Sequence, residues 1–440
     1  MTGISYIFYG WSNPLFTLLM LFSTAIDYFC GLIIGESGEE RLLYRKTALY
    51  VSIASNLSLL CFFKYTGFAL ESYNQLFLFF NVENFDAVPV LNFLLPLGIS
   101  FYTFQSMSYT IDVYRREADH IRNFLDFACF VSMFPQLVAG PIIRFQEVAE
   151  QLASRVHSFE KFARGVAFFS LGMAKKVLLA NSCGKIADIT FSAGSTYWLD
   201  AWYGIVAYAF QIYFDFSGYS DMAIGLGLMF GFVFAKNFDS PYISTSITEF
   251  WRRWHISLST WLREYLYIPL GGNRKGTTRT AINLAIVMLL GGLWHGASWN
   301  FVIWGALHGA LMGGERLFGR KPLYCSLPRP LQVVATFILV LIAWVFFRAE
   351  NLGDAFLYLG SMFNLVTVPE SSFLLDGLLY SPYHLLAMAL AGIVVWCMPQ
   401  TWDWTRSMTV SKVVSILMLF ILSVAILSMQ SYNPFIYFNF

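Results

Sequence analysis

The chain has 440 residues, of which 57% belong to the hydrophobic set and only 12% are charged. A soluble globular domain carries about 25% charged residues, so this composition excludes a soluble protein, and it excludes a disordered one as well. The formal net charge of +1 and the pI near 7.6 exclude the strong basic excess of a nucleic-acid-binding protein. Mean hydropathy of +0.58 and an aromatic content of 18% are typical of a chain embedded in lipid.

Apolar segments recur along the whole chain. At roughly 20 residues per span, the length accommodates about ten to twelve transmembrane helices. The segments lie near 4–34, 47–63, 90–112, 123–139, 162–180, 197–214, 222–235, 281–294, 299–315, 331–347, 382–398 and 413–430. The sequence therefore predicts an all-α, polytopic integral membrane protein.

Basic residues indicate which connections face the cytoplasm. They cluster in 41–46, 115–122 and 316–329, whereas 66–89 and 351–381 contain no Lys or Arg. Cytoplasmic loops of membrane proteins carry the excess of Lys and Arg. We therefore expect the first three segments in the cytoplasm and the last two outside.

The middle of the chain, residues 182–296, differs in texture from both flanks. Its apolar runs are broken, and Gly, Ser and ionisable residues lie close to Trp and Tyr. Irregular backbone at membrane depth must be shielded from lipid. This composition predicts re-entrant or interfacial helices that line a water-accessible cavity.

The segment 250–270 has the pattern of an interfacial helix. At 100° per residue its apolar arc contains Trp251, Trp254, Leu258, Trp261, Leu262 and Tyr265, and its polar arc contains Arg252, Arg253, Ser259, Thr260, Arg263 and Glu264. His255 falls on the border. One hypothesis is a plain anchor whose aromatic side chains face the bilayer; the other is that a histidine flanked by arginines faces a phosphorylated substrate at the cytoplasmic interface.

The segment 291–309 carries His295 at the end of a long apolar run, between glycines that admit close approach. An ionisable residue at membrane depth indicates a functional site, although a packed histidine that donates to a helix carbonyl is the alternative. For His308, thirteen residues further on, the structural interpretation is preferred.

Two other motifs favour structural roles. Asp215 and Asp221 flank a Ser-Gly-Tyr-Ser break, and such carboxylates need Lys or Arg partners from neighbouring helices. The run 134–145 contains Gly-Pro within an apolar stretch, which predicts a broken helix or a tight turn.

Absent motifs narrow the chemistry further. The chain has no G-x-S-x-G elbow, no P-loop and no G-x-G-x-x-G after a strand, and His295 has no second His, Asp or Glu at metal-ligand spacing. We therefore expect no metal. The residues alone support a membrane protein with one or two histidines in a polar cavity, and a transporter of polysaccharide or lipid-linked sugar remains an alternative to an enzyme.

Several long motifs resemble one known family. They are LLPLGISFYTFQSMSYTIDVYR, FPQLVAGPIIRF, YFDFSGYSDMAIGLGLMFGF, NFDSPYISTSITEFWRRWHISLSTWLREYLYIPLGGNRKG, GGLWHGASWNFVIWGALHG and the terminal SYNPFIYFNF. Together they resemble the membrane-bound O-acyltransferase superfamily, and within it the bacterial alginate O-acetyltransferase branch. Family members usually have one more helix before FYGWSNP and a longer stretch at 398–411.

The resemblance implies a ring of helices around a central tunnel, formed by a single membrane domain over residues 1–440. Within it, 1–180 would be N-terminal helices, 181–316 the catalytic core and 317–440 C-terminal helices. The essential histidine of the family's WHG segment maps onto His295, and a second conserved position maps onto His255.

The implied activity is O-acetyl transfer from cytoplasmic acetyl-coenzyme A, a substrate and not a bound cofactor, with His295 as general base. Trp294 and Asn300 would orient His295 or donate to the oxyanion, and Arg252, Arg263 and Lys275 would meet the phosphates. The expected location is the bacterial inner membrane, with contacts to membrane lipid. The expected partners are a periplasmic acetyltransferase and an exopolysaccharide such as alginate, with peptidoglycan or cellulose as alternatives.

Overall fold

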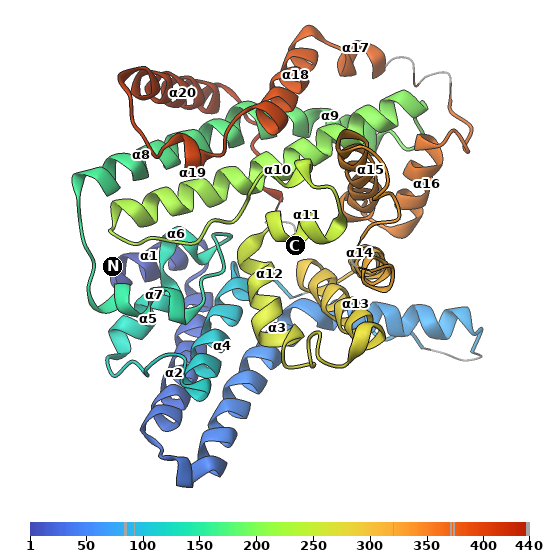
Figure 1. Cartoon of the computed structure of the whole chain (residues 1–440). Helices are drawn as coiled ribbons and strands as arrows, with labels where there is room; N and C mark the ends of the chain where they lie inside the picture. Colours follow the sequence, from blue (N-terminus) through green and yellow to red (C-terminus); the bar gives the residue numbers. More distant parts are fainter. Residues whose placement is uncertain (83–85, 92, 320, 370–371, 373–374, 437–440) are drawn as a thin grey trace. The chain divides into compact units, whose positions relative to one another are not determined.

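The computed structural model describes all residues except 83–85, 92, 320, 370–371, 373–374 and 437–440, so the end of the terminal motif lies outside the described residues. Every regular element of the described residues is helical, as predicted (Figure 1). The chain forms two compact units, residues 1–156 with 232–234 and residues 157–231 with 235–440.

The first unit contains the N-terminal helices. Its elements are α1 (Thr2–Ser12), α2 (Pro14–Glu36), η1 (Glu39–Arg41), α3 (Leu42–Phe79), α4 (Ile99–Arg115), α5 (Phe124–Ser132), α6 (Phe134–Leu137) and α7 (Phe145–Ala153). The chain breaks between α6 and α7, which confirms the turn predicted for 134–145. In contrast, α3 continues to Phe79, where the sequence predicted a connection from Thr66, because no proline interrupts this stretch.

The second unit holds both candidate histidines. Its elements are α8 (Phe159–Ala174), η2 (Lys175–Ala180), α9 (Asn181–Ser192), α10 (Trp198–Met229), η3 (Pro241–Ile243), α11 (Ile247–Arg253), α12 (Ile256–Leu262), η4 (Arg263–Tyr267), α13 (Gly276–His295), α14 (Trp299–Leu317), α15 (Arg329–Arg348), α16 (Leu352–Met362), α17 (Asp376–Leu379), α18 (Pro382–Cys397), α19 (Thr401–Trp404) and α20 (Val410–Met429). The short elements η3 to η4 occupy the middle segment where the sequence predicted broken helices.

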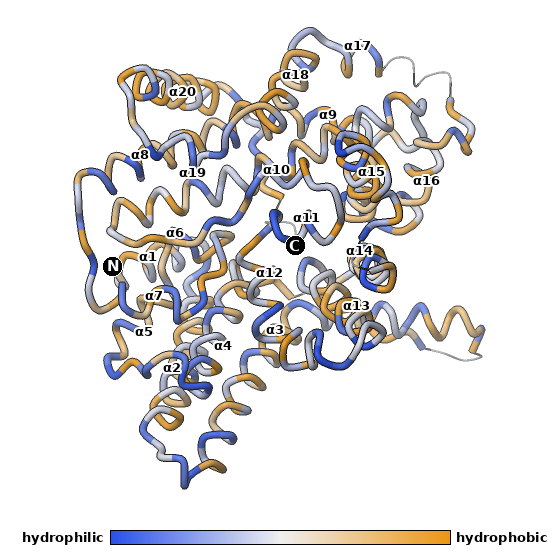
Figure 2. Tube along the Cα trace, viewed as in Figure 1, coloured by the Kyte–Doolittle hydropathy of each residue, from blue (hydrophilic) through white to orange (hydrophobic). Residues whose placement is uncertain are grey.

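Six helical stretches of the described residues are long and apolar enough to cross a membrane. They are 14–36, 39–79, 159–192, 276–295, 329–348 and 410–429, and the shorter apolar α18 adds to them. Figure 2 shows α20 as hydrophobic along most of its length, and few of its side chains are buried. Six is fewer than the expected ten to twelve, in part because helices such as α10 carry buried aspartates within their apolar runs.

Close backbone contacts hold the helix pairs of the second unit together. A Cβ atom on Gly172 of α8 would lie 2.5 Å from the carbonyl oxygen of Gly218 on α10. A Cβ atom on Gly305 of α14 would lie 2.4 Å from the carbonyl oxygen of Met288 on α13. Within lipid the hydrophobic effect does not drive helices together, so their association depends on close packing. Small residues such as glycine allow the backbones to approach closely enough for this packing. The α13–α14 pair, which carries His295, is therefore fixed by backbone contact.

We expect Gly305→Ala to destabilise the protein, because the added methyl group overlaps the backbone of α13 and overpacking costs about 1–3 kcal/mol. Gly314→Ala is the matched control in the same helix, where a Cβ meets nothing within 4 Å. It should be neutral or stabilising by up to about 1 kcal/mol. Thermal unfolding in detergent measures both, and equal melting temperatures would contradict the close-packing argument.

Candidate active site

His295 is the last residue of α13, and Gly296, in extended conformation, ends the helix. Its side chain is buried. Ring centroids of Trp294, Trp304 and Phe347 lie 5.0, 5.2 and 5.2 Å from that of His295. An aromatic cage thus limits the orientations that the imidazole can adopt.

His255 lies near His295, with 6.4 Å between the ring centroids. It is fully buried, with the ring of Phe216 at 4.6 Å in edge-to-face contact. This burial lowers the pKa of His255 to about 3, so the imidazole is neutral at physiological pH. The structure therefore brings the two predicted histidines together, although 40 positions separate them in the sequence.

The helix predicted over 250–270 is wrong in two respects. The chain breaks at His255, which has a left-handed backbone with φ of 43°, so that α11, α12 and the π-helical η4 replace one continuous helix. The aromatic arc does not face the bilayer, because all six of its side chains are buried within the protein. Packing within the second unit outweighs the amphipathic pattern.

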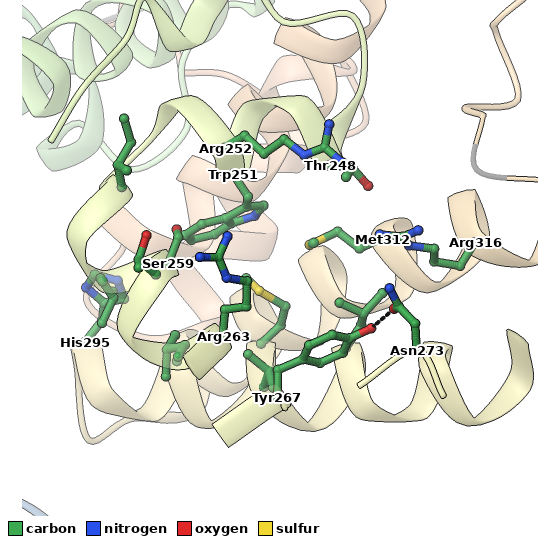
Figure 3. A pocket seen from close by; sticks show the side chains of 18 of the residues that line it. Thr248, Trp251, Arg252, Ser259, Arg263, Tyr267, Asn273, His295, Met312 and Arg316 are labelled. Atoms are coloured by element: carbon green, nitrogen blue, oxygen red, sulfur yellow. Dashed lines mark hydrogen bonds between the residues drawn. The ribbon is translucent and has the colours of Figure 1, made fainter. Parts of the chain in front are cut away.

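A cavity of about 350 Å³ opens between these elements (Figure 3). Arg252 and Arg263 line it, as does Arg316 from the last turn of α14, and His295 lies at the other end from Arg316. The remaining lining is mostly apolar, with Ser259, Thr248 and Asn273 among its polar side chains. Among the described residues, no Asp or Glu lines the cavity.

The positive charge of this cavity is only partly balanced. Arg263 pairs with Glu264 at 2.8 Å, and its side chain is 60% exposed. Among the described residues, neither Arg252 nor Arg316 has an ion pair or a side-chain hydrogen bond, and the Nε atom of Arg316 is buried. Uncompensated guanidinium groups favour an anionic ligand, above all a phosphate. Sequence analysis missed Arg316, which it assigned only to a basic connection.

The other three residues predicted for the site, Lys275, Asn300 and Trp294, do not line the cavity. Lys275 is exposed before the start of α13 and does not line the cavity. The amide of Asn300 donates to the carbonyl oxygen of Ala349 at 2.6 Å, so this contact supports the backbone after α15. Trp294 is buried against His295. The structure thus favours Arg316 over Lys275 as the third cation of the cavity.

Glu315 holds α11, and with it Arg252, in place. Its buried carboxylate accepts the backbone N–H groups of Ile247 and Thr248, at 2.8 and 3.0 Å. These are two of the groups that a helix N-terminus leaves without intrahelical partners. One end of α14 therefore supplies both a cation of the cavity and the cap of α11.

Three other polar residues of the core, Asp215, Asp221 and His308, have structural partners. Asp221 pairs with Lys175 at 2.7 Å and Asp215 with Lys176 at 2.6 Å, as the sequence predicted for these carboxylates. His308 accepts the indole N–H of Trp251 at 3.2 Å. Among the described residues, no group of three or more His, Cys, Asp or Glu has a geometry suited to a metal ion.

Comparison with known proteins agrees with the motifs. The family model of membrane-bound O-acyltransferases matches residues 15–348. The probable alginate O-acetylase AlgI of Azotobacter vinelandii is 44% identical over 99% of this chain and 93% of its own length. Its counterpart in Pseudomonas aeruginosa is 49% identical over 82% of this chain and 69% of its own length. The peptidoglycan O-acetyltransferase of Helicobacter pylori is 35% identical over 99% of this chain and 90% of its own length. The chain therefore belongs to the membrane-bound O-acyltransferase family, and it is a multi-pass membrane acyltransferase.

We expect Glu315→Ala to destabilise the second unit, because the buried N–H of Ile247 and the half-buried N–H of Thr248 lose their acceptor, at a cost of about 1–3 kcal/mol. Glu315→Gln retains one acceptor oxygen and should lose less. Glu350→Ala, at an exposed position, is the control. Thermal unfolding compares the three variants, and a melting temperature of Glu315→Ala equal to that of the control would disprove the capping role.

Proposed function

We propose that this acyltransferase moves an acetyl group from acetyl-coenzyme A, at the cytoplasmic face of the bacterial inner membrane, to hydroxyl groups of alginate outside. The relatives named alginate O-acetylase support the acceptor. The observation that supports the donor is the cavity in which three arginines, and no acidic residue of the described part of the chain, accompany His295. A periplasmic acetyltransferase is the expected partner in delivery to the polymer.

In this reaction His295 acts as general base. It takes the proton of the attacking hydroxyl as the new C–O bond forms, and the C–S bond of the thioester then breaks. The imidazolium returns the proton to the leaving thiolate, so that an ester and free coenzyme A result. A neutral imidazole suits this role at physiological pH, and the aromatic cage of Trp294, Trp304 and Phe347 keeps the ring oriented.

The arginines serve to bind the donor. Arg252 and Arg316 carry charges that no described side chain compensates, and a pyrophosphate would form charge-assisted hydrogen bonds with them. Because His295 lies at the other end of the cavity from Arg316, a donor whose phosphates meet the arginines extends toward the base. The opening of the cavity is then the cytoplasmic one, in agreement with the basic connection that follows Arg316.

Peptidoglycan is the second candidate acceptor. The Helicobacter pylori relative with that activity in its name matches 99% of this chain. Deletion of the gene, followed by acetate analysis of alginate and of peptidoglycan from the same cells, separates the two acceptors. The proposal requires the loss of acetate from alginate alone.

His295→Ala should reduce acetyl transfer by about 10²- to 10⁴-fold, since this is the usual contribution of a general base. Alginate acetate in a complemented deletion strain is the measurement, with His157→Ala, at an exposed histidine outside the cavity, as the control. Gel filtration of both variants establishes that equal amounts are folded. Near-normal acetate from folded His295→Ala would rule out the assignment.

Arg252→Gln and Arg316→Gln should raise the KM for acetyl-coenzyme A more than they lower kcat, because phosphate contacts remote from the thioester contribute mostly uniform binding. The effect should weaken in high salt, which screens charges at an open cavity. Arg279→Gln removes an exposed arginine that does not line the cavity and serves as the control. Thioester hydrolysis by purified protein measures KM, and unchanged values in both variants would refute donor binding.

A further inference from the structure

Asn237, in the connection between α10 and η3, is a buried residue that the sequence analysis did not single out. Its backbone carbonyl accepts the N–H of Ile256 at 2.9 Å. Its side-chain oxygen accepts the N–H and the hydroxyl of Ser257, at 3.2 and 2.9 Å, and lies 3.1 Å from Nδ1 of His255. One residue thus bonds to three consecutive positions around the break at His255.

These contacts determine the tautomer of His255. A backbone N–H is always a donor, so the Asn237 atom that meets the N–H of Ser257 must be the amide oxygen and not the nitrogen. An amide oxygen only accepts, and Nδ1 of His255 must therefore carry a proton and donate it. In a neutral imidazole, Nε2 then has a lone pair and no proton.

The surroundings of His255 keep this form neutral. Its ring contacts Phe216 from α10 and both Trp294 and His295 from α13, and its polar contacts come from Asn237 and Ser257. Among these contacts with described residues, His295 is the one titratable group, and none of the five residues carries a fixed charge. Burial lowers the pKa of His255 to about 3, so no charge change occurs near neutrality.

Nε2 of His255 has no hydrogen-bond partner among the described residues, although it is buried. The two histidine rings are 6.4 Å apart, which is too far for a direct nitrogen-to-nitrogen hydrogen bond of about 3 Å even after both ring radii are subtracted. Nε2 of His255 is therefore a buried acceptor close to His295 that no described residue satisfies. Backbone strain at a non-glycine residue with positive φ also persists only where surrounding bonds impose it, and Asn237 supplies these bonds.

We propose that Asn237 is a positioning residue that holds His255 as the Nδ1–H tautomer, so that Nε2 accepts a hydrogen bond from a hydroxyl group of the acceptor and keeps the acceptor beside His295. The inference rests on the proposed function for the role of His295, whereas the tautomer itself rests on the contacts of Asn237 alone. It gives His255 a defined task, namely to bind the acceptor through an unprotonated nitrogen.

Nitrogen-15 NMR of the full chain, labelled at histidine in lipid bilayers, tests the tautomer without any activity assay. His255→Gln identifies the signals of His255, which should show a protonated Nδ1 and an unprotonated Nε2. Asn237→Leu should remove this pattern. Asn283→Leu, which replaces another buried asparagine that donates to Gly272, should leave it intact. A protonated Nε2 in the native protein would overturn the inference while the donor-binding proposal could still hold.

The pH dependence of acetyl transfer tests whether His255 binds the acceptor through its unprotonated Nε2. Asn237→Asp retains an acceptor for Nδ1–H but adds a negative charge, which raises the pKa of His255 and favours the imidazolium, whose Nε2 cannot accept. An opposite charge raises a pKa by about 1–3 units, and each pH unit below the raised pKa lowers the neutral fraction about tenfold. As the pH is lowered, Asn237→Asp should therefore lose activity at a higher pH than the native protein, and its activity should recover toward neutral pH. Asn283→Asp is the control. An Asn237→Asp profile that parallels the native one would show that Asn237 is only structural.

Discussion

Helices buried in a membrane protein break only where other groups accept or donate the hydrogen bonds that the break exposes, because lipid offers none. The second unit meets this constraint with side chains from distant segments. Glu315 caps the start of α11, and Asn237 accepts the N–H groups of Ile256 and Ser257 after the break at His255. These contacts replace helix hydrogen bonds, place His255 in the interior and hold the start of the helix that carries Arg252, and so the site depends on them.

Charged residues that are paired within the protein differ in role from those that have no partner among the described residues. Two aspartates of α10, Asp215 and Asp221, are paired at hydrogen-bond distance with the lysines of η2, and Asp215 also accepts the N–H of Ile436. These carboxylates therefore have partners within the protein. In contrast, Arg252 and Arg316 share one cavity that no described Asp or Glu lines. An anionic donor would balance their charge, as the proposed function requires.

The sequence was sufficient for features that depend on local pattern. Apolar length predicted membrane helices, and Gly-Pro predicted the break before α7. The end of an apolar run identified His295 as a candidate residue.

The sequence was insufficient for features that depend on contacts between residues far apart in the chain. The 100° periodicity of 250–270 does not distinguish a continuous helix from the broken one. The break at His255 depends on hydrogen bonds with Asn237, which lies 18 residues earlier in the chain. Arg316 reaches the cavity through the packing of α14 on α13, which no local pattern encodes. The expected division of one domain at 180 and 316 stays a prediction.

The central claim is that the arginine-lined cavity delivers an acyl donor to His295. The most direct measurement is an electron cryomicroscopy structure of the full chain with a non-hydrolysable acetyl-coenzyme A analogue. The account predicts phosphate density against Arg252 and Arg316 and the acyl carbonyl beside the imidazole of His295. Analogue bound elsewhere, or with its acyl group directed away from His295, would contradict it.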